Sequence, residues 1–180
     1  MDGILNIDMI KGKNVSFRSL EKNDLGLLKD WRNSENMRKT TREFRLLNMI
    51  NQENWFENLY LNTPPKDIMF GVIQKNKLIG VTGLTYIDWK NKHAEISIYF
   101  TLKNWQQTKQ AKETIDILKK YAFEELNLHR LWAEIFAIAT ENRALFKRMK
   151  FQEEGVLKDK LWRKGKWWDA VICSSISSDN

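Results

Sequence analysis

Residues 68–101 decide the fold, and they read IMFGVIQKNKLIGVTGLTYIDWKNKHAEISIYFT. Two strand-like runs, 68–74 and 77–86, flank Lys75 and Asn76, and an asparagine in a two-residue connection suits the positive φ of a tight hairpin. Residues 93–101 then alternate, with Ala, Ile and Phe on one face and Glu, Ser and Tyr on the other. These three strands predict an antiparallel meander.

Further strands and helices are predicted around this meander from hydrophobic periodicity. Strands are expected at residues 15–20, 130–138, 151–158 and 167–174. Helices are expected at residues 24–31, 52–61, 107–126 and 141–149. Thr140 is expected to cap the last helix. The resulting order, β-α-α-β-β-β-α-β-α-β-β, predicts the α+β class, with about four helices on one largely antiparallel sheet.

The length and composition predict one folded domain. A chain of 180 residues suits a single domain, 1–180, with a core over about 15–176. Aromatic residues make up 12% of the chain, which excludes a disordered tail protein. No run approaches the roughly 18 apolar residues of a membrane span, and no basic segment followed by an apolar one begins the chain. We therefore expect a cytoplasmic protein without membrane contact.

The net charge and the few cysteines and histidines limit the kinds of ligand and partner that we expect. Lys and Arg number 30 against 23 Asp and Glu, a formal net charge of +7 that favours an anionic partner, such as a nucleotide cofactor or a nucleotide-linked substrate. Nucleic acid is not expected, because the lysines are interleaved with acids. The chain has one cysteine, Cys173, and two histidines, His93 and His129, so we expect neither a disulfide nor a bound metal.

Several short motifs, taken in order, resemble the GNAT superfamily of N-acetyltransferases. They are NKLIG at 76–80, AEISIY at 94–99, the segment 139–151, and FQEEG at 151–155 followed by GKWWD at 165–169. The ending is similar to that of the ribosomal-protein and small-molecule branch. The short segments DWRN at 30–33, MR at 37–38 and WF at 55–56 resemble those of the branch that acetylates nucleotide-linked amino sugars. The resemblance implies a single domain in which the fourth and fifth strands splay apart.

The resemblance also implies acetyl-CoA as the acetyl donor. The segment QQTKQA at 106–111 stands where the superfamily binds the pyrophosphate at a helix start, but Lys109 replaces a glycine. Lys109 either adds a positive charge to the phosphate site, or clashes with the loop that glycine permits, or belongs to an ordinary solvated helix start. The implied cofactor-binding residues are Ile98, Tyr99, Phe100, Gln106, Gln107, Thr108, Lys109, Gln110, Ala111, Lys112 and Asn142. Asn142 could equally be a plain first-turn residue.

The implied proton chemistry departs from the family pattern. Glu95 stands where many members carry a basic carboxylate, and His93 lies on the same strand face as the reserve base; alternatively, Glu95 is a solvent-facing strand residue. Phe146 stands where a tyrosine commonly protonates the leaving thiolate. The thiolate then leaves unassisted or with water, which its pKa near 8.5 tolerates.

The acceptor is expected on the side of the first two helices. The implied acceptor-binding residues are Trp31, Arg38, Arg42, Arg45 and Trp55. Arginines among aromatics could grip a diphosphate and stack a base, or they could form an exposed basic loop. We expect an N-acetyltransferase for a small-molecule or nucleotide-linked amine, as a monomer or homodimer. The alternatives are a protein N-terminal or ribosomal-protein acetyltransferase, and a non-catalytic module that binds acyl-CoA or a partner.

Overall fold

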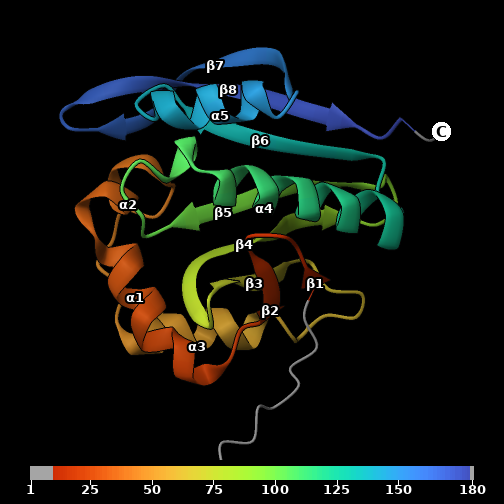
Figure 1. Ribbon diagram of the computed structural model, residues 1–180. Coiled ribbons are helices and arrows are strands. Elements are labelled where there is room, and N and C mark those ends of the chain that lie inside the picture. Colours follow the sequence, from red (N-terminus) through yellow and green to blue (C-terminus); the bar gives the residue numbers. More distant parts are fainter. Residues whose placement is uncertain (1–9, 179–180) are drawn as a thin grey trace, which may run out of the picture.

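The computed structural model describes residues 10–178 as one mixed sheet with helices on both faces (Figure 1). The strands are β1 (Ile10–Lys11), β2 (Ser16–Ser19), β3 (Ile68–Gln74), β4 (Lys77–Asp88), β5 (His93–Phe100), β6 (Arg130–Phe136), β7 (Gln152–Arg163) and β8 (Lys166–Ile176). The helices are α1 (Leu25–Asn33), α2 (Glu35–Thr40), α3 (Met49–Asn58), α4 (Lys109–Lys120) and α5 (Thr140–Arg148). Short turns are η1 (Lys22–Asp24), η2 (Trp105–Gln107) and the π-helical η3 (Tyr121–Glu125).

The sheet has the order β1-β2-β3-β4-β5-β6-β8-β7. The meander predicted from residues 68–101 is confirmed as β3, β4 and β5, and Lys75 and Asn76 have φ values of 47° and 61°. Every neighbouring pair is antiparallel except β5 and β6. The α+β class with a largely antiparallel sheet is therefore confirmed.

The parallel strands β5 and β6 pair over a short stretch and then separate. Their register joins only His93–Glu95 to Arg130–Trp132, although β5 continues to Phe100 and β6 to Phe136. Backbone groups beyond Glu95 are thereby left without a strand partner on the β6 side. The predicted splay is confirmed, and it opens directly above Glu95.

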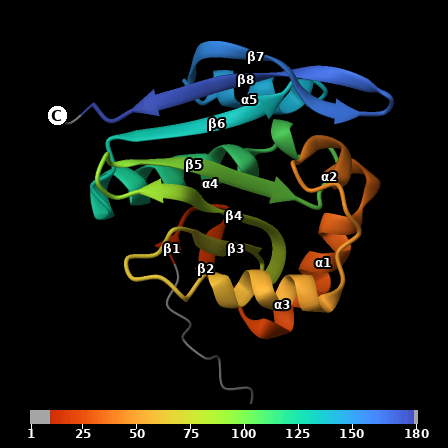
Figure 2. The same ribbon diagram turned by 180° about the vertical axis from the view of Figure 1, so that it is seen from behind.

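Two hydrophobic clusters hold the helices against the two faces of the sheet. One face of the sheet packs against α4 and α5 through residues such as Ile115 and Phe146, and the other against α1 and α3 through residues such as Leu28 and Phe56. α4 lies in front of β5 in Figure 1 and behind it in the turned view of Figure 2. The acceptor-side helices and α4 therefore flank opposite faces of the splayed strands. No helix among residues 10–178 is long and apolar enough to cross a membrane.

Two local predictions are corrected. The helix expected over 107–126 is regular only from Lys109 to Lys120 and ends in the π-helical turn η3. Thr140 does not cap α5, because Ala139 is the N-cap and Thr140 already lies in the helix, where its hydroxyl donates to Glu141. The described residues form five α-helices, in agreement with the expected number of about four, and the short additional helix is α2, which Ser34 caps.

Candidate active site

A wide cleft of about 1740 Å³ opens at the splay. Its walls come from α1, α2, the segment 41–47, β5, β6 and the start of α5. Trp31 and Trp55, both expected at the acceptor, line the cleft, and Trp31 packs edge-on against Tyr99 with ring centroids 6.4 Å apart. The structure thus brings the expected acceptor wall and the exposed backbone of β5 to one space.

Glu95 lies at the base of the splay and is 5% exposed. It is not itself a cleft-lining residue, but Arg42 and Glu134, which contact it, both line the cleft. Both of its carboxylate oxygens accept hydrogen bonds from Arg42, at 2.9 Å from Nη1 and 2.7 Å from Nη2. The amide nitrogen of Glu134 lies 3.4 Å from Oε1. The carboxylate is buried and bonded, so the alternative of a solvent-facing strand residue does not describe it.

Glu134, which the sequence reasoning missed, joins the same cluster from β6. Its Oε2 accepts from Nε of Arg42 at 2.9 Å and also from Nη2, so one guanidinium bridges two carboxylates. Its other oxygen, Oε1, is buried without a hydrogen bond, and Nζ of Lys160 lies 3.8 Å from it. Burial opposes the charge of Arg42, but its bonds to Glu95 and Glu134 outweigh this and raise the pKa of Arg42 above its usual value.

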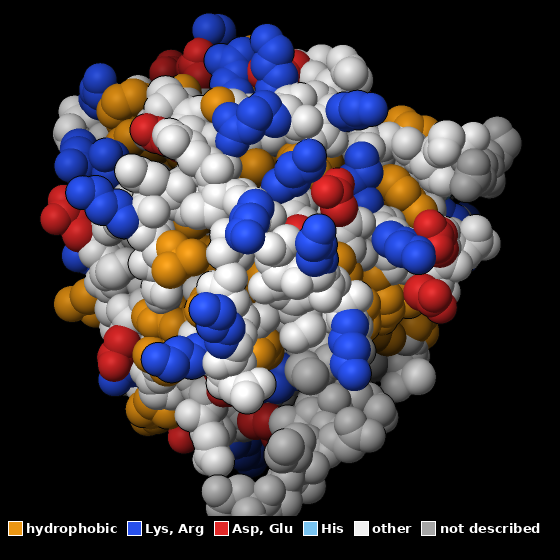
Figure 3. All heavy atoms as spheres, viewed as in Figure 1, with side chains coloured by type: hydrophobic (Ala, Val, Ile, Leu, Met, Phe, Trp, Pro, Cys, Tyr) orange, Lys and Arg blue, Asp and Glu red, His pale blue; other side chains and the backbone are white. Residues whose placement is uncertain are grey.

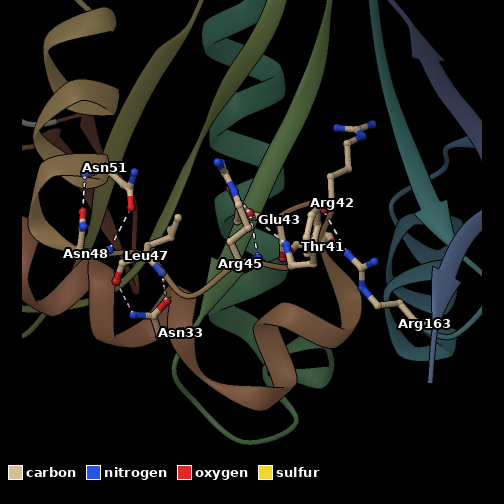
Figure 4. Close-up of polar contacts among 10 residues, drawn as sticks. Asn33, Thr41, Arg42, Glu43, Arg45, Leu47, Asn48, Asn51 and Arg163 are labelled. Atoms are coloured by element: carbon tan, nitrogen blue, oxygen red, sulfur yellow. Dashed lines mark hydrogen bonds and ion pairs between the residues drawn. The ribbon is translucent and has the colours of Figure 1, made fainter. Parts of the chain in front are cut away.

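The segment that carries Arg42 is held at both ends (Figure 4). The guanidinium of Arg163, on β7, donates to the carbonyls of Thr41 and Arg42 at 3.0 Å each. The side-chain amide of Asn33 donates to the carbonyl of Leu47 at 2.8 Å and accepts from its amide at 2.7 Å. The main chain is therefore fixed, while the Arg42 side chain remains 45% exposed.

The other predicted acceptor arginines are placed differently. Arg45 lines the cleft and pairs with Glu43, and its hydrogen bonds lower the pKa of Glu43 to about 2. Arg38 donates from Nε to the carbonyl of Asn33 at 3.2 Å and is not among the cleft-lining residues. Arg32 does line the cleft, with its guanidinium 5.9 Å from the ring centroid of Tyr99.

His93 lies at the opposite end of β5 from the splay. Its Nε2 is 3.7 Å from Oδ2 of Asp88, and it is not among the residues that line the cleft. It shares a strand face with Glu95 as expected, but it faces Asp88 on β4, whereas Glu95 is bonded to Arg42.

The expected cofactor backbone lines the cleft along β5. Ile98, Tyr99 and Phe100 all belong to the wall, and burial raises the pKa of Tyr99 to about 12. Phe146 also lines the cleft and packs edge-on against Phe151 at 5.0 Å. A hydrocarbon ring therefore stands where the family commonly has a proton donor.

A second pocket, of about 490 Å³, lies at the start of α4. Its lining residues are Gln106, Gln107, Thr108, Lys109, Lys112, Leu145, Arg148 and Met149. Thr108 caps the helix by accepting from the amide of Ala111, which is fully buried. Gln110 and Ala111 are absent from this lining. Figure 3 shows that Lys and Arg side chains are scattered over the face of the molecule on which α4 lies in Figure 1.

Two predicted cofactor residues meet between the pockets. Nε2 of Gln106 donates to Oδ1 of Asn142 at 2.8 Å, and Arg148 donates to the carbonyl of Gln106 at 2.7 Å. These bonds join the start of α5 to the turn before α4, so the two pockets share the Gln106 wall. Within residues 10–178, no group of three or more His, Cys, Asp or Glu residues is arranged to hold a metal ion.

Comparison with known proteins places these features in a family context. Residues 17–172 match the family described as "Acetyltransferase (GNAT) domain". The chain is 31% identical over 112 residues to "Uncharacterized N-acetyltransferase p20" of Bacillus licheniformis, a match that covers 61% of this chain and 62% of that protein. It is 28% identical over 146 residues to "Uncharacterized N-acetyltransferase YoaA" of Bacillus subtilis (strain 168), covering 77% and 81%.

Solved structures share the fold. Spermidine N-acetyltransferase from Vibrio cholerae, in complex with CoA and spermine, has a TM-score of 0.83 at 22% identity and covers 93% of this chain and 98% of that one. RimL, a ribosomal L7/L12 α-N-protein acetyltransferase in complex with CoA, has a TM-score of 0.85 at 15% identity, covering 96% and 100%. At these identities the likeness concerns the fold alone.

Proposed function

Because the chain belongs to the acetyltransferase (GNAT) domain family, we propose that it transfers the acetyl group of acetyl-CoA to the primary amine of a small-molecule acceptor. The observation that carries this proposal is the buried carboxylate of Glu95 at the base of the splay, beside the unpaired backbone of β5. A base removes the proton that keeps an amine from attacking, and an open strand edge can pair with the amides of an acyl-CoA arm.

The chain's own residues fit acetyl-CoA. Peptide groups of Ile98 to Phe100 are available to pair with the amides of the pantetheine arm, as a neighbouring strand would. The pocket at the start of α4 offers Lys109, Lys112 and a capped helix N-terminus to the pyrophosphate. Neither lysine forms an ion pair with a carboxylate of the described residues, which supports the first of the three interpretations of Lys109.

Glu95 acts as the base in this proposal. The acceptor ammonium gives one proton to the carboxylate, and the neutral amine then attacks the thioester carbon that acetyl-CoA supplies. The new C–N bond forms as the C–S bond breaks, the amide nitrogen loses a second proton to water, and the thiolate leaves and takes up a proton from solvent. Phe146 lines the cleft but has no proton to donate, and because solvent protonates the thiolate, the step needs no acidic side chain there.

For the acceptor we propose a nucleotide-linked amino sugar. Its phosphates would be bound by Arg32 and Lys39, which line the cleft from α1 and α2 and form no ion pair with a carboxylate of residues 10–178. These two cations take over the role first assigned to Arg38, Arg42 and Arg45, because Arg38 does not line the cleft and the other two are already paired. Trp31 and Trp55 offer aromatic faces for the base.

The second candidate is a protein N-terminal or polyamine acceptor. It is favoured by the width of the cleft and by the carboxylates of Glu95 and Glu134, which attract a cation. A non-catalytic acyl-CoA-binding module remains the alternative outside enzymes.

Amine-dependent release of CoA thiol separates these candidates. The assay has a low protein background, because burial raises the pKa of the lone Cys173 thiol to about 12. A uridine-diphosphate amino sugar, spermidine and an N-terminal peptide are compared at saturating acetyl-CoA, with wild type and Arg32→Ala.

The proposal expects the sugar nucleotide to be preferred, and Arg32→Ala to raise its KM by about tenfold, since an arginine–phosphate contact contributes about 1.5–3 kcal/mol. Preference for spermidine or the peptide would overturn the acceptor assignment. Acetyl-CoA binding without release of thiol with any amine would favour the non-catalytic module.

A further inference from the structure

Two buried carboxylates share one cation at the base of the splay, where Arg42 and Glu134 line the cleft. The side chains of Glu95 and Glu134 are each 6% exposed, and they project from neighbouring strands at the point where those strands separate. Arg42 satisfies three of the four carboxylate oxygens. Two carboxylates with one guanidinium carry a net charge of −1. The ammonium of Lys160 compensates this charge weakly, because its Nζ lies 3.8 Å from Oε1 of Glu134.

One acceptor position in this cluster is unused. Oε1 of Glu134 is buried and receives no hydrogen bond. A buried carboxylate oxygen without a donor is unfavourable, and it marks a place where one more N–H group would be stabilised. The cluster is therefore built to hold a cation with several donors, and Arg42 uses it incompletely.

The Arg42 side chain can move away from the two carboxylates while its main chain stays in place. Its main chain is held by Arg163, and the segment that follows is held by Asn33 through Leu47. The guanidinium reaches the carboxylates from the solvent side, 45% exposed and 5.8 Å from the ring centroid of the exposed Tyr86. A rotation about its own side-chain bonds would carry it to solvent without moving the segment.

We propose that Glu95 and Glu134 form the binding subsite for the ammonium group of the acceptor, and that Arg42 is an internal cation which the acceptor displaces. This inference rests on the proposed function, because only an amine acceptor gives the subsite a ligand. It assigns Glu134 to acceptor binding and gives Arg42 the role of an exchangeable occupant.

Displacement brings the acceptor nitrogen to the base. An ammonium group has three N–H donors, so it can bond to a carboxylate oxygen of Glu95 and to both oxygens of Glu134, including the unused Oε1. The same contact delivers a proton to Glu95 before attack. In the free protein Arg42 bonds to both carboxylates, so neither is left without a cationic partner.

The direct test is cation binding in the absence of acetyl-CoA. Arg42→Ala vacates the subsite, and methylguanidinium at millimolar concentration is the probe, with tetramethylammonium at equal ionic strength as the cation that cannot donate hydrogen bonds. Arg45→Ala is the matched control, because it removes the same charge from the same segment and leaves Glu95 and Glu134 paired. Calorimetry and the midpoint of thermal unfolding are the readouts.

The expected result is saturable binding of methylguanidinium to Arg42→Ala, with a raised unfolding midpoint, and no such effect in wild type or Arg45→Ala. Adding Glu134→Gln to Arg42→Ala should abolish the binding. If Arg42→Ala does not fold, Arg42→Gln, which keeps side-chain bulk, takes its place. Equal effects of the two probes, or binding that persists in the Glu134→Gln double variant, would overturn the proposal.

Steady-state kinetics give the second readout. With the internal competitor removed, the acceptor KM of Arg42→Ala should fall by about three- to tenfold, since the attached guanidinium competes at a high effective concentration. A KM that rises would mean that Arg42 itself binds the acceptor. Because the cation measurement needs no turnover, its failure is distinct from a failure of the acetyltransferase activity.

Discussion

On the acceptor side of the cleft, Arg42 and Arg45 are both paired with carboxylates, whereas at the start of α4 Lys109 and Lys112 have no such partners among the described residues. The difference has a structural origin. Glu113, the acid nearest to these lysines along the helix, is engaged by the amides of Lys13 and Asn14 and by the Asn14 side chain. The α4 pocket is thus left positive, while Arg42 and Arg45 on the acceptor side are already bonded to carboxylates.

This contrast indicates two modes of ligand binding. An anion can enter the α4 pocket without breaking an existing ion pair, and the helix start is already capped. The ammonium group of an acceptor must instead exchange partners with Glu95, Glu134 and Arg42, which are bonded to one another. We therefore expect charge changes near α4 to affect the affinity for acetyl-CoA, and changes at Glu95 and its neighbours to affect turnover and the acceptor.

The largest effect is expected for Glu95→Gln. This change removes the base and should lower turnover by roughly 10²-fold or more while acetyl-CoA affinity is kept. Glu134→Gln is the matched control, because it removes the other carboxylate bound to Arg42 and should mainly raise the acceptor KM. Steady-state kinetics with calorimetry distinguish the two. Equal losses of turnover in both variants would mean that the pair acts only as a structural unit.

Lys109→Glu should weaken acetyl-CoA binding about fivefold. One reversed charge beside a pyrophosphate changes the binding free energy by about 1 kcal/mol. Lys90→Glu is the control, since Lys90 lies in the exposed turn before β5. That turn is hydrogen-bonded to His129 and Arg130, which follow α4, and not to the residues at the start of α4. Calorimetric titrations of both variants make the comparison. Unchanged affinity in Lys109→Glu would place the phosphates elsewhere.

Glu113→Gln tests how the α4 pocket acquires its charge. Burial alone would raise the pKa of Glu113, but hydrogen bonds from Asn14 and Lys13 and the charge of Lys109 lower it. A lowered folded-state pKa stabilises the fold above the unfolded value of about 4.3 and ceases to do so as the pH falls. Urea unfolding should show a loss of about 1 kcal/mol at pH 7 and a smaller one at pH 3.5. A loss that is the same at both pH values would contradict this account.

The smallest effect is expected for Phe146→Tyr. It adds a hydroxyl on the cleft wall where the family commonly has an acid, and turnover should stay within about twofold or rise, because a thiolate is a tolerable leaving group near neutral pH. The pH profile of turnover is the measurement. A large loss of turnover would indicate that the apolar contact with Phe151 orders the site.

The sheet and its splay could be predicted from the sequence because their signals are local. Alternation over β5 places Glu95 opposite Ile96, and Lys75–Asn76 fixes the hairpin. Glu134 carried the same kind of signal, since burial alternates along β6 from Arg130 to Ile135 and Glu134 lies on the less buried face. Its meaning depended on knowing that β6 runs parallel to β5.

The pairing of Arg42 could not be predicted in this way. The segment 41–47 has no periodicity, and Arg42 meets carboxylates 53 and 92 residues away in the sequence. Its position depends on Asn33 and on Arg163, which is supplied by β7 more than 120 residues later. Contacts of this kind follow from tertiary packing, so the acceptor side was predicted as a set of residues and not as a bonded arrangement.

The most direct test of the account is a calorimetric titration of acetyl-CoA into the wild-type protein without any acceptor. Because the α4 pocket and the backbone of β5 need no rearrangement, the account predicts saturable binding with one site per chain, and unchanged affinity in Arg42→Ala. Absence of binding to the wild-type protein would contradict the acetyltransferase assignment itself.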